Sequence, residues 1–466
     1  MGSNNKSKGR KSFKICQDVR IPKLLPYAKL IKYINSVNVG NVKQLNDFCD
    51  SNEKVNGAYR ELHEFLPILA ELYIEIHKLL GCNSYLMKFG YEHYHFLVSI
   101  GADGAPFGKH DEATAWLVSF LNSGDRITSQ NENFLFAGVN CAEDHVCMKR
   151  FAKKIVSDVK AIESKEFFVD GYLVTFSFEM VPADMKWLAS FSGELCNASY
   201  FFSSFANVNS DNKRTVNGTL GPEPENTWQP WAYERRLEVA KLVAKTKETL
   251  SHKNLSNSTR RNKVLNTIRD LGSRQEFEPV LGRLIDKAHA EPLHNSNNAW
   301  QYMHGKILQE AVVKSNIPTS CTDVSTLSLD SPFKKFLFAL KDDVKASRLY
   351  KKILIWFKSG RSKKFEYRFT GKDARMLSHN FMYLIHSLTL PNDSKQSQLR
   401  LATLAFCCLK LRDAVSLFSR IVVDNASVIG DLKKCCLQFF NAVSLMLADV
   451  SPTIWTIGYA IPCILN

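Results

Sequence analysis

Two aspartates stand where short apolar segments of the chain end. Asp103 follows the segment 96–102 (FLVSIGA), and Asp184 follows the segment 172–181 (YLVTFSFEMV) after Pro182. Carboxylate oxygens suit Mg²⁺ or Mn²⁺, and a pair of such ions can activate an attacking oxygen and stabilise a leaving one in phosphodiester displacement. If the two segments are neighbouring strands, these residues predict a divalent-metal site with Asp103 and Asp184 as metal ligands and catalytic residues.

A third polar group lies further along the chain, at Glu291 and His294 in the segment EPLHNSNN (291–298). An acid and an imidazole could join a metal-dependent site, but a Pro-interrupted stretch could equally be a helix N-terminus with surface histidines. A plain alternative also exists for Asp103, because Gly104 follows it and Asp-Gly is a frequent turn dipeptide. The residues alone leave both alternatives open.

The region between about 95 and 193 has the pattern of alternating strands and helices. Short apolar segments rich in β-branched and aromatic residues predict strands, and apolar residues one turn apart predict a helix. The predicted order is strand 96–102, turn 104–108, strand 115–121, strand 134–139, helix 142–162, strand 172–181 closed by Pro182, and short helix 185–191 opened by Asp184.

Three strands, a helix and a fourth strand are the opening order of a ribonuclease-H-like sheet. A right-handed crossover places the fourth strand parallel to the first, so that both carboxyl ends reach one edge, where ligands of open α/β sheets collect. Asp103 and Asp184, 81 residues apart in the chain, would be neighbours there. The predicted fold class is an α/β ribonuclease-H-like core with a largely α-helical N-terminal lead-in and a helical C-terminal region.

Composition divides the 466 residues into four parts. The expected parts are a disordered basic tail (1–22), a helical lead-in (23–90), the core with a helical insertion (91–315) and a helical domain with a basic cluster (316–466). Within them, an apolar stripe from Leu62 to Leu80 predicts a helix packed against a neighbour. The chain after about 195 is expected to be mainly helical, broken by a Pro- and Gly-rich loop at 218–230.

The formal charge of +15 comes from two short segments. Residues 1–35 carry a net +8 and residues 345–375 a net +9, so the rest of the chain sums to −2. Clustered positive charge focuses potential and indicates a polyanionic partner, here DNA. The predicted nucleic-acid-binding residues are Arg348, Lys351, Lys352, Lys358, Arg361, Lys363, Lys364 and Arg368.

Aromatic residues are interleaved with the cations of the segment 345–375. Exposed rings could stack on unpaired bases while Lys and Arg meet phosphates. The alternative is a helix whose apolar side is buried and whose lysines face solvent. We expect features of both alternatives: the aromatic residues lie mostly in the core, and the cations mostly contact the phosphate backbone of the nucleic acid.

Several classes of protein and of cofactor are not supported by the sequence. Its twelve cysteines contain no CxxC pair, so structural zinc is not expected. No P-loop is present, so no nucleotide cofactor is expected, and the absence of G-x-S-x-G and HExxH motifs argues against a serine hydrolase and a zinc protease. The polar N-terminus and the short apolar run 454–465 predict a nuclear or cytoplasmic chain that is neither secreted nor inserted in a membrane.

Three segments carry a family resemblance. SIGADGAPFG (99–108), PADMKWLASFSG (182–193) and EPLHNSNN (291–298) resemble transposon-derived proteins of animal genomes and, more remotely, CACTA-type cut-and-paste transposases with a DDE/D ribonuclease-H-like core. The likeness covers about residues 95–300. It implies that Asp103 and Asp184 are the first two catalytic acids and that Glu291 and His294 form an acidic-x-x-His signature.

Two departures from that family affect what the resemblance implies. Such transposases often have a Cys pair after the second Asp, whereas this chain has only Cys196 there. Their last catalytic Glu lies on a helix after a long helical insertion, and the chain is expected to end before that helix. Glu291 is then a signature residue, and a complete DDE triad is not predicted.

The resulting hypothesis is a DNA transposase, or a nuclease relic of one, that uses Mg²⁺ or Mn²⁺ for phosphodiester hydrolysis and strand transfer. DNA is the expected partner, and a homo-oligomer is a further expectation. The alternatives are a catalytically inactive nucleic-acid-binding protein that retains the fold, and a helical scaffold protein in which Asp103 is a turn residue.

Overall fold

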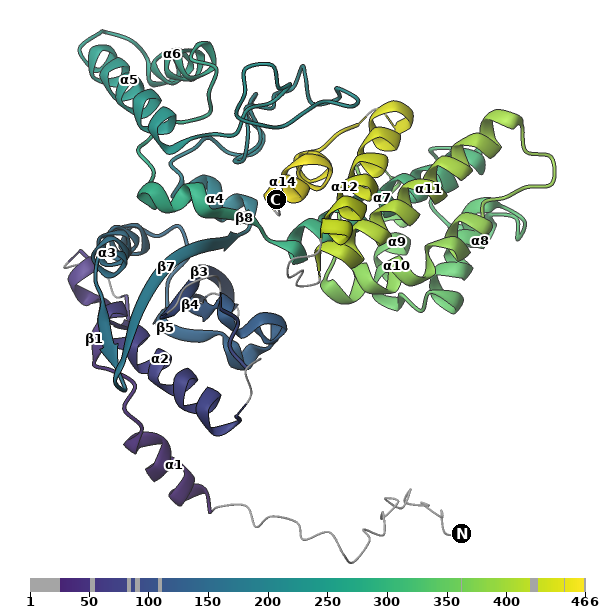
Figure 1. The fold of residues 1–466 in the computed structure, drawn as a ribbon. Coiled ribbons are helices and arrows are strands. Elements are labelled where there is room, and N and C mark those ends of the chain that lie inside the picture. The colour runs from purple at the N-terminus through teal and green to yellow at the C-terminus, as the bar shows by residue number, and fades with distance from the viewer. Residues whose placement is uncertain are drawn as a thin grey trace, which may run out of the picture.

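The computed structural model of the chain describes residues 26–50, 55–81, 85–88, 93–107, 111–361, 363–419, 426–447 and 449–464. A sheet with its covering helices, a pair of helices and a larger group of helices are seen in Figure 1. The predicted basic tail 1–22 lies outside the described residues.

One mixed sheet of eight strands forms the first half of the protein. Its order is β1-β2-β5-β4-β3-β7-β6, and β8 pairs with the end of β7. The strands are β1 (Val42–Gln44), β2 (Gly57–Arg60), β3 (Tyr94–Phe107), β4 (Asp111–Phe120), β5 (Phe134–Val139), β6 (Phe167–Val169), β7 (Tyr172–Ala183) and β8 (Ala288–Ala290). β3 and β4 are antiparallel, β4 and β5 are antiparallel, and β3 and β7 are parallel, which confirms the predicted relation of the first and fourth strands.

Two predicted strand ends were wrong. β3 does not turn at Asp103, because its ladder with β4 continues through Asp103↔Ala115 to the pair formed with Asp111. The Asp-Gly dipeptide is therefore inside a strand. β7 continues through Pro182, which forms a register pair with His289 of β8; a Pro is tolerated there because it lies at the strand's end.

The N-terminal lead-in is less helical than predicted. It contains α1 (Tyr27–Ser36) and α2 (Leu62–Leu79), but β1 and β2 lie between these helices, and β2 extends the sheet beside β5. Strands of three and four residues are too short for a period-two pattern to be recognised. The apolar stripe of α2 packs as predicted, with Phe65, Leu66 and Tyr73 buried in the core of the sheet.

The helix α3 (Val146–Glu163) connects β5 to the strands that follow it. Its buried side includes Phe151 and Ile155, which join the same core as the sheet residues Trp116 and Phe136. This helix is the predicted crossover, and it explains why β7 returns parallel to β3. The short helix α4 (Met185–Phe191) begins directly after Asp184, as predicted.

The segment after α4 is not helical, contrary to the prediction of a mainly helical chain from about 195. Residues 192–232 form turns and isolated bridges, such as Phe201 with Asn209. Side-chain hydrogen bonds stabilise these turns, among them the one that Trp228 Nε1 donates to Asn212 Oδ1 (3.0 Å). The helices α5 (Tyr233–Ser251) and α6 (Asn257–Asp270) follow and share a small core of their own.

The C-terminal half is mostly helical. Its helices are α7 (Pro292–Lys314), α8 (Pro332–Phe338), α9 (Ser347–Lys358), α10 (Gly371–His386), α11 (Lys395–Phe418), α12 (Ala426–Ala442), α13 (Pro452–Trp455) and α14 (Ile461–Ile464), with π-helical turns at Ala339–Asp343, Val443–Leu447 and Thr456–Ala460. They share one core, into which Trp228 and Trp455 pack with ring centroids 5.5 Å apart. None of the helices in the described ranges has the length and apolar character needed to cross a membrane.

Candidate active site: an acidic cleft where β3 and β7 separate

The parallel strands β3 and β7 separate partway along β3 and close to the carboxyl end of β7. Their pairing ends at Ser99↔Met180; beyond this point β3 stays with β4, and the last three residues of β7 pair with β8. Asp184 directly follows β7, and Glu291 directly follows β8. The divergence therefore opens a space between strand ends that point to the same edge of the sheet.

A cleft of about 340 Å³ occupies this edge, and all four residues predicted as catalytic line it. Asp103, Asp184, Glu291 and His294 are thus brought together from positions spread over 192 residues of the chain. Leu117 and Trp187 contribute apolar surface to the same cleft. Because residues inside β3 and directly after β7 and β8 supply the carboxylates, the arrangement depends on the sheet topology rather than on one local motif.

Two glycines of β3 allow close approach at the cleft. A Cβ atom at Gly101 would lie 3.2 Å from the carbonyl oxygen of Pro182, and one at Gly104 would lie 3.0 Å from Oε2 of Glu143. Gly104 is the residue after Asp103, so the Asp-Gly dipeptide brings a second carboxylate toward the first. The glycine serves close packing in a strand, a role different from that of a turn former.

Glu143 is a cleft residue that the sequence analysis missed. It lies in the turn between β5 and α3, and its side chain is 16% exposed. Partial burial raises its pKa, Asp184 and Asp103 raise it further, and Lys186, whose Nζ lies 3.5 Å away, opposes them. A signal for it existed: β5 runs in the direction of β3 after two antiparallel reversals, so the loop after β5 reaches the same edge.

The acidic groups of the cleft affect one another's protonation. Partial desolvation raises the pKa of Asp103, and the charges of Asp184 and Glu291 raise it further, while His294 opposes them. Like charges held near one another favour the protonated form, so this cleft is destabilised until a positive charge neutralises it. That is the electrostatic property expected of a cation-binding site.

Asp184 also caps a helix. Its Oδ1 accepts a hydrogen bond from the backbone N of Trp187 (2.6 Å) at the start of α4. Asp184→Ala is expected to lower the free energy of unfolding by about 1 kcal/mol, because the N-cap acceptor is lost, whereas Asp184→Asn keeps the cap and the stability. Chemical denaturation of the two variants measures this difference; equal loss in both would contradict the capping role.

Glu291 and His294 form an ion pair at the start of α7. Glu291 is the N-cap of this helix, its Oε2 accepts a hydrogen bond from the backbone N of His294 (3.0 Å), and the same oxygen contacts Nδ1 of the ring. The predicted alternative of a helix N-terminus is therefore confirmed, but His294 is half-buried and lines the cleft, so it is not the surface histidine of that alternative. The hydrogen bond from His294 lowers the pKa of Glu291 against the effect of burial, and Glu291 raises the pKa of His294.

Glu291→Gln is expected to lower the pKa of His294, because burial then acts on the ring without its anionic partner. The pair stabilises the protein at pH values below the ordinary His pKa of 6.5, and this stability is lost as pH rises through the raised pKa. An NMR titration of the ring protons tests the shift. An unchanged titration curve would contradict the pairing.

The residue types that line the cleft are those that bind a hard divalent cation. Asp103, Asp184 and Glu143 offer carboxylate oxygens, which Mg²⁺ and Mn²⁺ prefer, and their mutual repulsion favours a bound cation. Within the part of the chain that the structure describes, no three His, Cys, Asp or Glu side chains are already gathered closely enough to hold an ion. Binding would therefore require side-chain rotation, with Asp103 and Asp184 as the predicted ligands.

The eight predicted nucleic-acid-binding residues divide between α9 and the segment that follows it. Seven of them are exposed, and Arg361 is half-buried. The aromatic residues agree with the expectation from the sequence: Phe357, Tyr367 and Phe369 are buried, while Trp356 and Phe365 are half-buried. The structure brings Arg361, Lys363 and Lys364 to a second cleft, and it places the four α9 cations outside that cleft.

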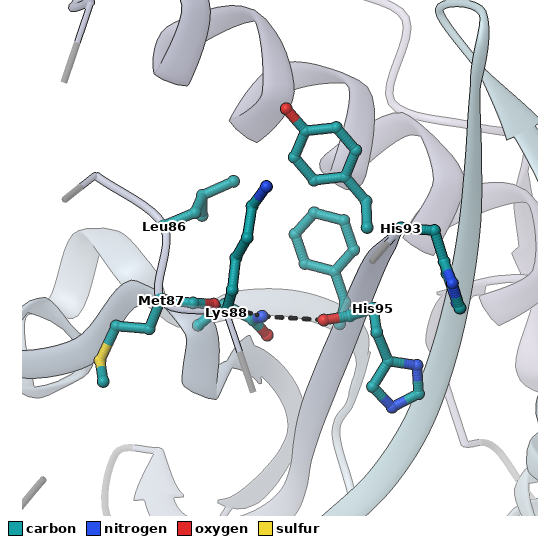
Figure 2. A pocket seen from close by; sticks show the side chains of 8 residues that line it. Leu86, Met87, Lys88, His93 and His95 are labelled. Atoms are coloured by element: carbon teal, nitrogen blue, oxygen red, sulfur yellow. Dashed lines mark hydrogen bonds between the residues drawn. The ribbon is translucent and has the colours of Figure 1, made fainter. Parts of the chain in front are cut away.

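A histidine pair marks the opposite end of β3. His95 Nδ1 lies 2.6 Å and His93 Nε2 lies 2.8 Å from Oγ1 of Thr175, and the carbonyl oxygen of His95 accepts a hydrogen bond from Asn122 Nδ2 (2.9 Å; Figure 2). Burial and the neighbouring His93 lower the pKa of His95. These partners join β3, β7 and the loop after β4, so this pair is structural.

Comparison with known proteins gives no relative: neither a family model nor a curated protein matches the chain.

Proposed function

We propose that this protein cleaves and joins DNA strands by divalent-metal-dependent phosphodiester chemistry at the acidic cleft, as a transposase or a nuclease derived from one. The observation that carries the proposal is that Asp103, Asp184, Glu291 and His294 line one cleft together with Glu143. These four were singled out from sequence for this chemistry, and neighbouring acidic groups with perturbed pKa values are typical of catalytic sites.

The strand order supports a ribonuclease-H-like core as the basis of this function. The order β5-β4-β3-β7, the parallel relation of β3 and β7, and the crossover helix α3 agree with that fold, and β8 adds a fifth strand, parallel to β7. In that fold the acidic residues belong near the carboxyl ends of the first and fourth strands; Asp184 directly follows β7, and Asp103 lies inside β3, beyond the point where its pairing with β7 ends.

Each cleft residue has a chemical role in the proposal. Asp103 and Asp184 would hold the divalent ion, which supplies Lewis-acid neutralisation of the phosphate when bound. Glu143 adds a third carboxylate within reach of the first two. His294 stays protonated to a higher pH because of Glu291, so it can donate a hydrogen bond to an anionic phosphate oxygen. The exposed cations of α9 and the following segment would hold the DNA backbone.

A second candidate is a nucleic-acid-binding protein without cleavage activity. It is favoured by one observation: among the described residues no ready-made group of three metal-ligating side chains exists. The two candidates share the basic surface and differ only at the acidic cleft.

The deciding experiment compares two incubations of supercoiled plasmid DNA with the full chain. One contains Mg²⁺ or Mn²⁺, and the other contains a chelator. Nicked or linear DNA that forms only with the metal supports the first candidate. DNA binding without any metal-dependent product supports the second.

A further inference from the structure

A second cleft, of about 850 Å³, lies between α7 and the segment 359–370. One wall is α7, from Asn298 to Val312, and the other is formed by Trp356 and by residues of the segment from Gly360 to Phe369, with the residues 449–453 closing one side. It shares no residue with the acidic cleft. Its size suits a small organic group rather than a single ion.

The second cleft has an aromatic wall. Trp356 and Phe365 meet edge to face with centroids 5.6 Å apart, and Phe365 and Tyr367 are nearly parallel with centroids 6.3 Å apart. Trp356 Nε1 donates to the carbonyl oxygen of Lys363 (2.7 Å), which fixes the indole against the segment. Half-buried rings held in this way present flat surfaces on which a planar group can stack.

The ring of His304 packs among aromatic side chains, with its centroid 6.0 Å from that of Phe365 and 5.5 Å from that of Phe369. His304 of α7 lines the cleft, its side chain is 1% exposed, and no hydrogen-bond partner of its Nε2 is found within the described ranges. Burial lowers the pKa of this ring to about 4, so the imidazole is neutral at physiological pH. An unsatisfied buried polar atom destabilises the fold, and a ligand with a hydrogen-bonding edge that reached this nitrogen would remove that cost.

The rim of the second cleft is basic. Lys363 and Lys364 are exposed, and within the described part of the chain no carboxylate forms an ion pair with either of them. Arg361, by contrast, is held by the carbonyl oxygens of Pro318 (2.6 Å) and Cys321 (3.2 Å). The two lysines are therefore free to meet an anion, while the arginine positions the segment.

We propose that the second cleft binds one unpaired nucleotide of a DNA strand, with its base against Trp356 and Phe365 and its phosphate against Lys363 and Lys364. A planar group with a hydrogen-bonding edge and an attached anion is the chemical class that fits these walls, and aromatic side chains of this kind stack on bases of any sequence. The proposal rests on the proposed function, because it assigns the strand held at the acidic cleft.

The helix α7 connects the two clefts. Its N-cap Glu291 belongs to the acidic cleft, and Gly305, fourteen residues further on, lines the second one. At about 1.5 Å per residue, Glu291 and Gly305 are about 21 Å apart along the helix axis, and the α7 residues that line the second cleft begin at Asn298. The segment 359–370 runs back along α7: Phe369 N donates to Gln301 Oε1 (3.1 Å), and a Cβ at Gly371 would lie 3.2 Å from Leu293. One strand could thus contact both sites.

A larger side chain at Gly305 would fill the second cleft and leave its lysine and arginine residues unchanged. A Cβ at this position meets no atom within 4 Å, and Leu is a better helix former than Gly, so Gly305→Leu is expected to fold. The probe is a single-stranded oligonucleotide carrying 2-aminopurine, bound to the full chain in a chelator so that cleavage plays no part. The parent chain is expected to bind it at least fivefold more tightly than an oligonucleotide abasic at that position.

Gly305→Leu is expected to abolish this preference for the intact base, and His304→Phe, which keeps the ring but removes the nitrogen, is expected to reduce it. Gly305→Ala should retain it. Lys364→Gln should weaken binding of both oligonucleotides more than Lys352→Gln, since Lys352 lies outside the cleft. Asp103→Asn should leave the base preference intact, which separates a failure here from a failure of the proposed function.

Equal binding of intact and abasic oligonucleotides by the parent chain would overturn the proposal, as would an unchanged preference in Gly305→Leu. The last measurement is competition between the oligonucleotide probe and a free deoxynucleoside monophosphate. If it displaces the probe at the same concentration as the oligonucleotide does, the cleft is a mononucleotide site, and its assignment to a DNA strand is wrong.

Discussion

Asp103→Asn is expected to lower metal-dependent DNA cleavage by at least about 100-fold while leaving the folded protein no less stable than the parent. A bound ion contributes several kcal/mol of charge stabilisation in phosphoryl transfer, and about 1.4 kcal/mol corresponds to a tenfold rate change. The amide cannot replace the carboxylate as an anionic ligand. Plasmid nicking in Mg²⁺ measures the loss, with Asp125→Asn as a matched control, because Asp125 is exposed and lies outside the acidic cleft.

Stability provides an independent measure of the same variant. The pKa of Asp103 is raised in the folded protein, so its ionised form costs stability above that pKa and the cost disappears as pH falls through it. At neutral pH, Asp103→Asn removes this cost, and we expect a gain of at most about 1 kcal/mol, because Asp103 is exposed and its charge is screened. Lower stability together with unchanged cleavage would identify Asp103 as a structural residue.

Glu143 tests which group acts as the third carboxylate. If Glu143 completes the site with Asp103 and Asp184, Glu143→Gln loses cleavage as strongly as Asp103→Asn does, whereas Glu291→Gln has the smaller effect expected of a residue that caps α7. Full activity in Glu143→Gln would show that the third ligand lies elsewhere.

The parts of the site that could be predicted from the sequence are those that have a strong local pattern. The strand 134–139 and the helix start at Asp184 have the predicted bounds, because a continuous apolar run and an N-cap are local signals. Glu143 was missed because nothing around it marks a loop at the sheet edge; only the direction of β5 does. The Asp103-Gly104 dipeptide was misplaced at a strand end since cross-strand pairing, which sets strand length, is not a local property.

The prediction for the segment 192–232 was wrong for a different reason. Its order comes from long-range polar contacts rather than from a repeating pattern, and the centre of these contacts is Glu194, whose side chain is fully buried. Arg236 of α5 contacts one of its oxygens, and Arg274 Nε lies 3.0 Å from the other. Ser204 Oγ also donates to Glu194 (2.6 Å). No periodicity analysis can pair residues that are 42 and 80 positions apart.

Glu194→Gln is accordingly expected to destabilise the protein by about 3–5 kcal/mol, the cost of breaking a buried ion pair from one side. The side chains of Arg236 and Arg274 are 4% and 1% exposed, so both guanidinium groups would remain buried without an anion. Burial already lowers the pKa of Arg274, and Glu194 opposes that effect. Denaturant unfolding measures the loss, with Trp231, whose Nε1 donates to the carbonyl oxygen of Ser203 (2.9 Å), as a local fluorescent probe.

The matched control for this change lies on the same helix. Arg235 and Glu238 of α5 form an ion pair whose side chains are 46% and 60% exposed, so Glu238→Gln is expected to cost less than about 1 kcal/mol. Both changes remove one charge by the same Glu-to-Gln substitution. The difference between their losses of unfolding free energy therefore measures the effect of burial. Equal effects would mean that water reaches Glu194 in solution. A selective loss in Glu194→Gln would show that this buried pair stabilises the protein through the contacts that join the segment after α4 to α5 and to Arg274.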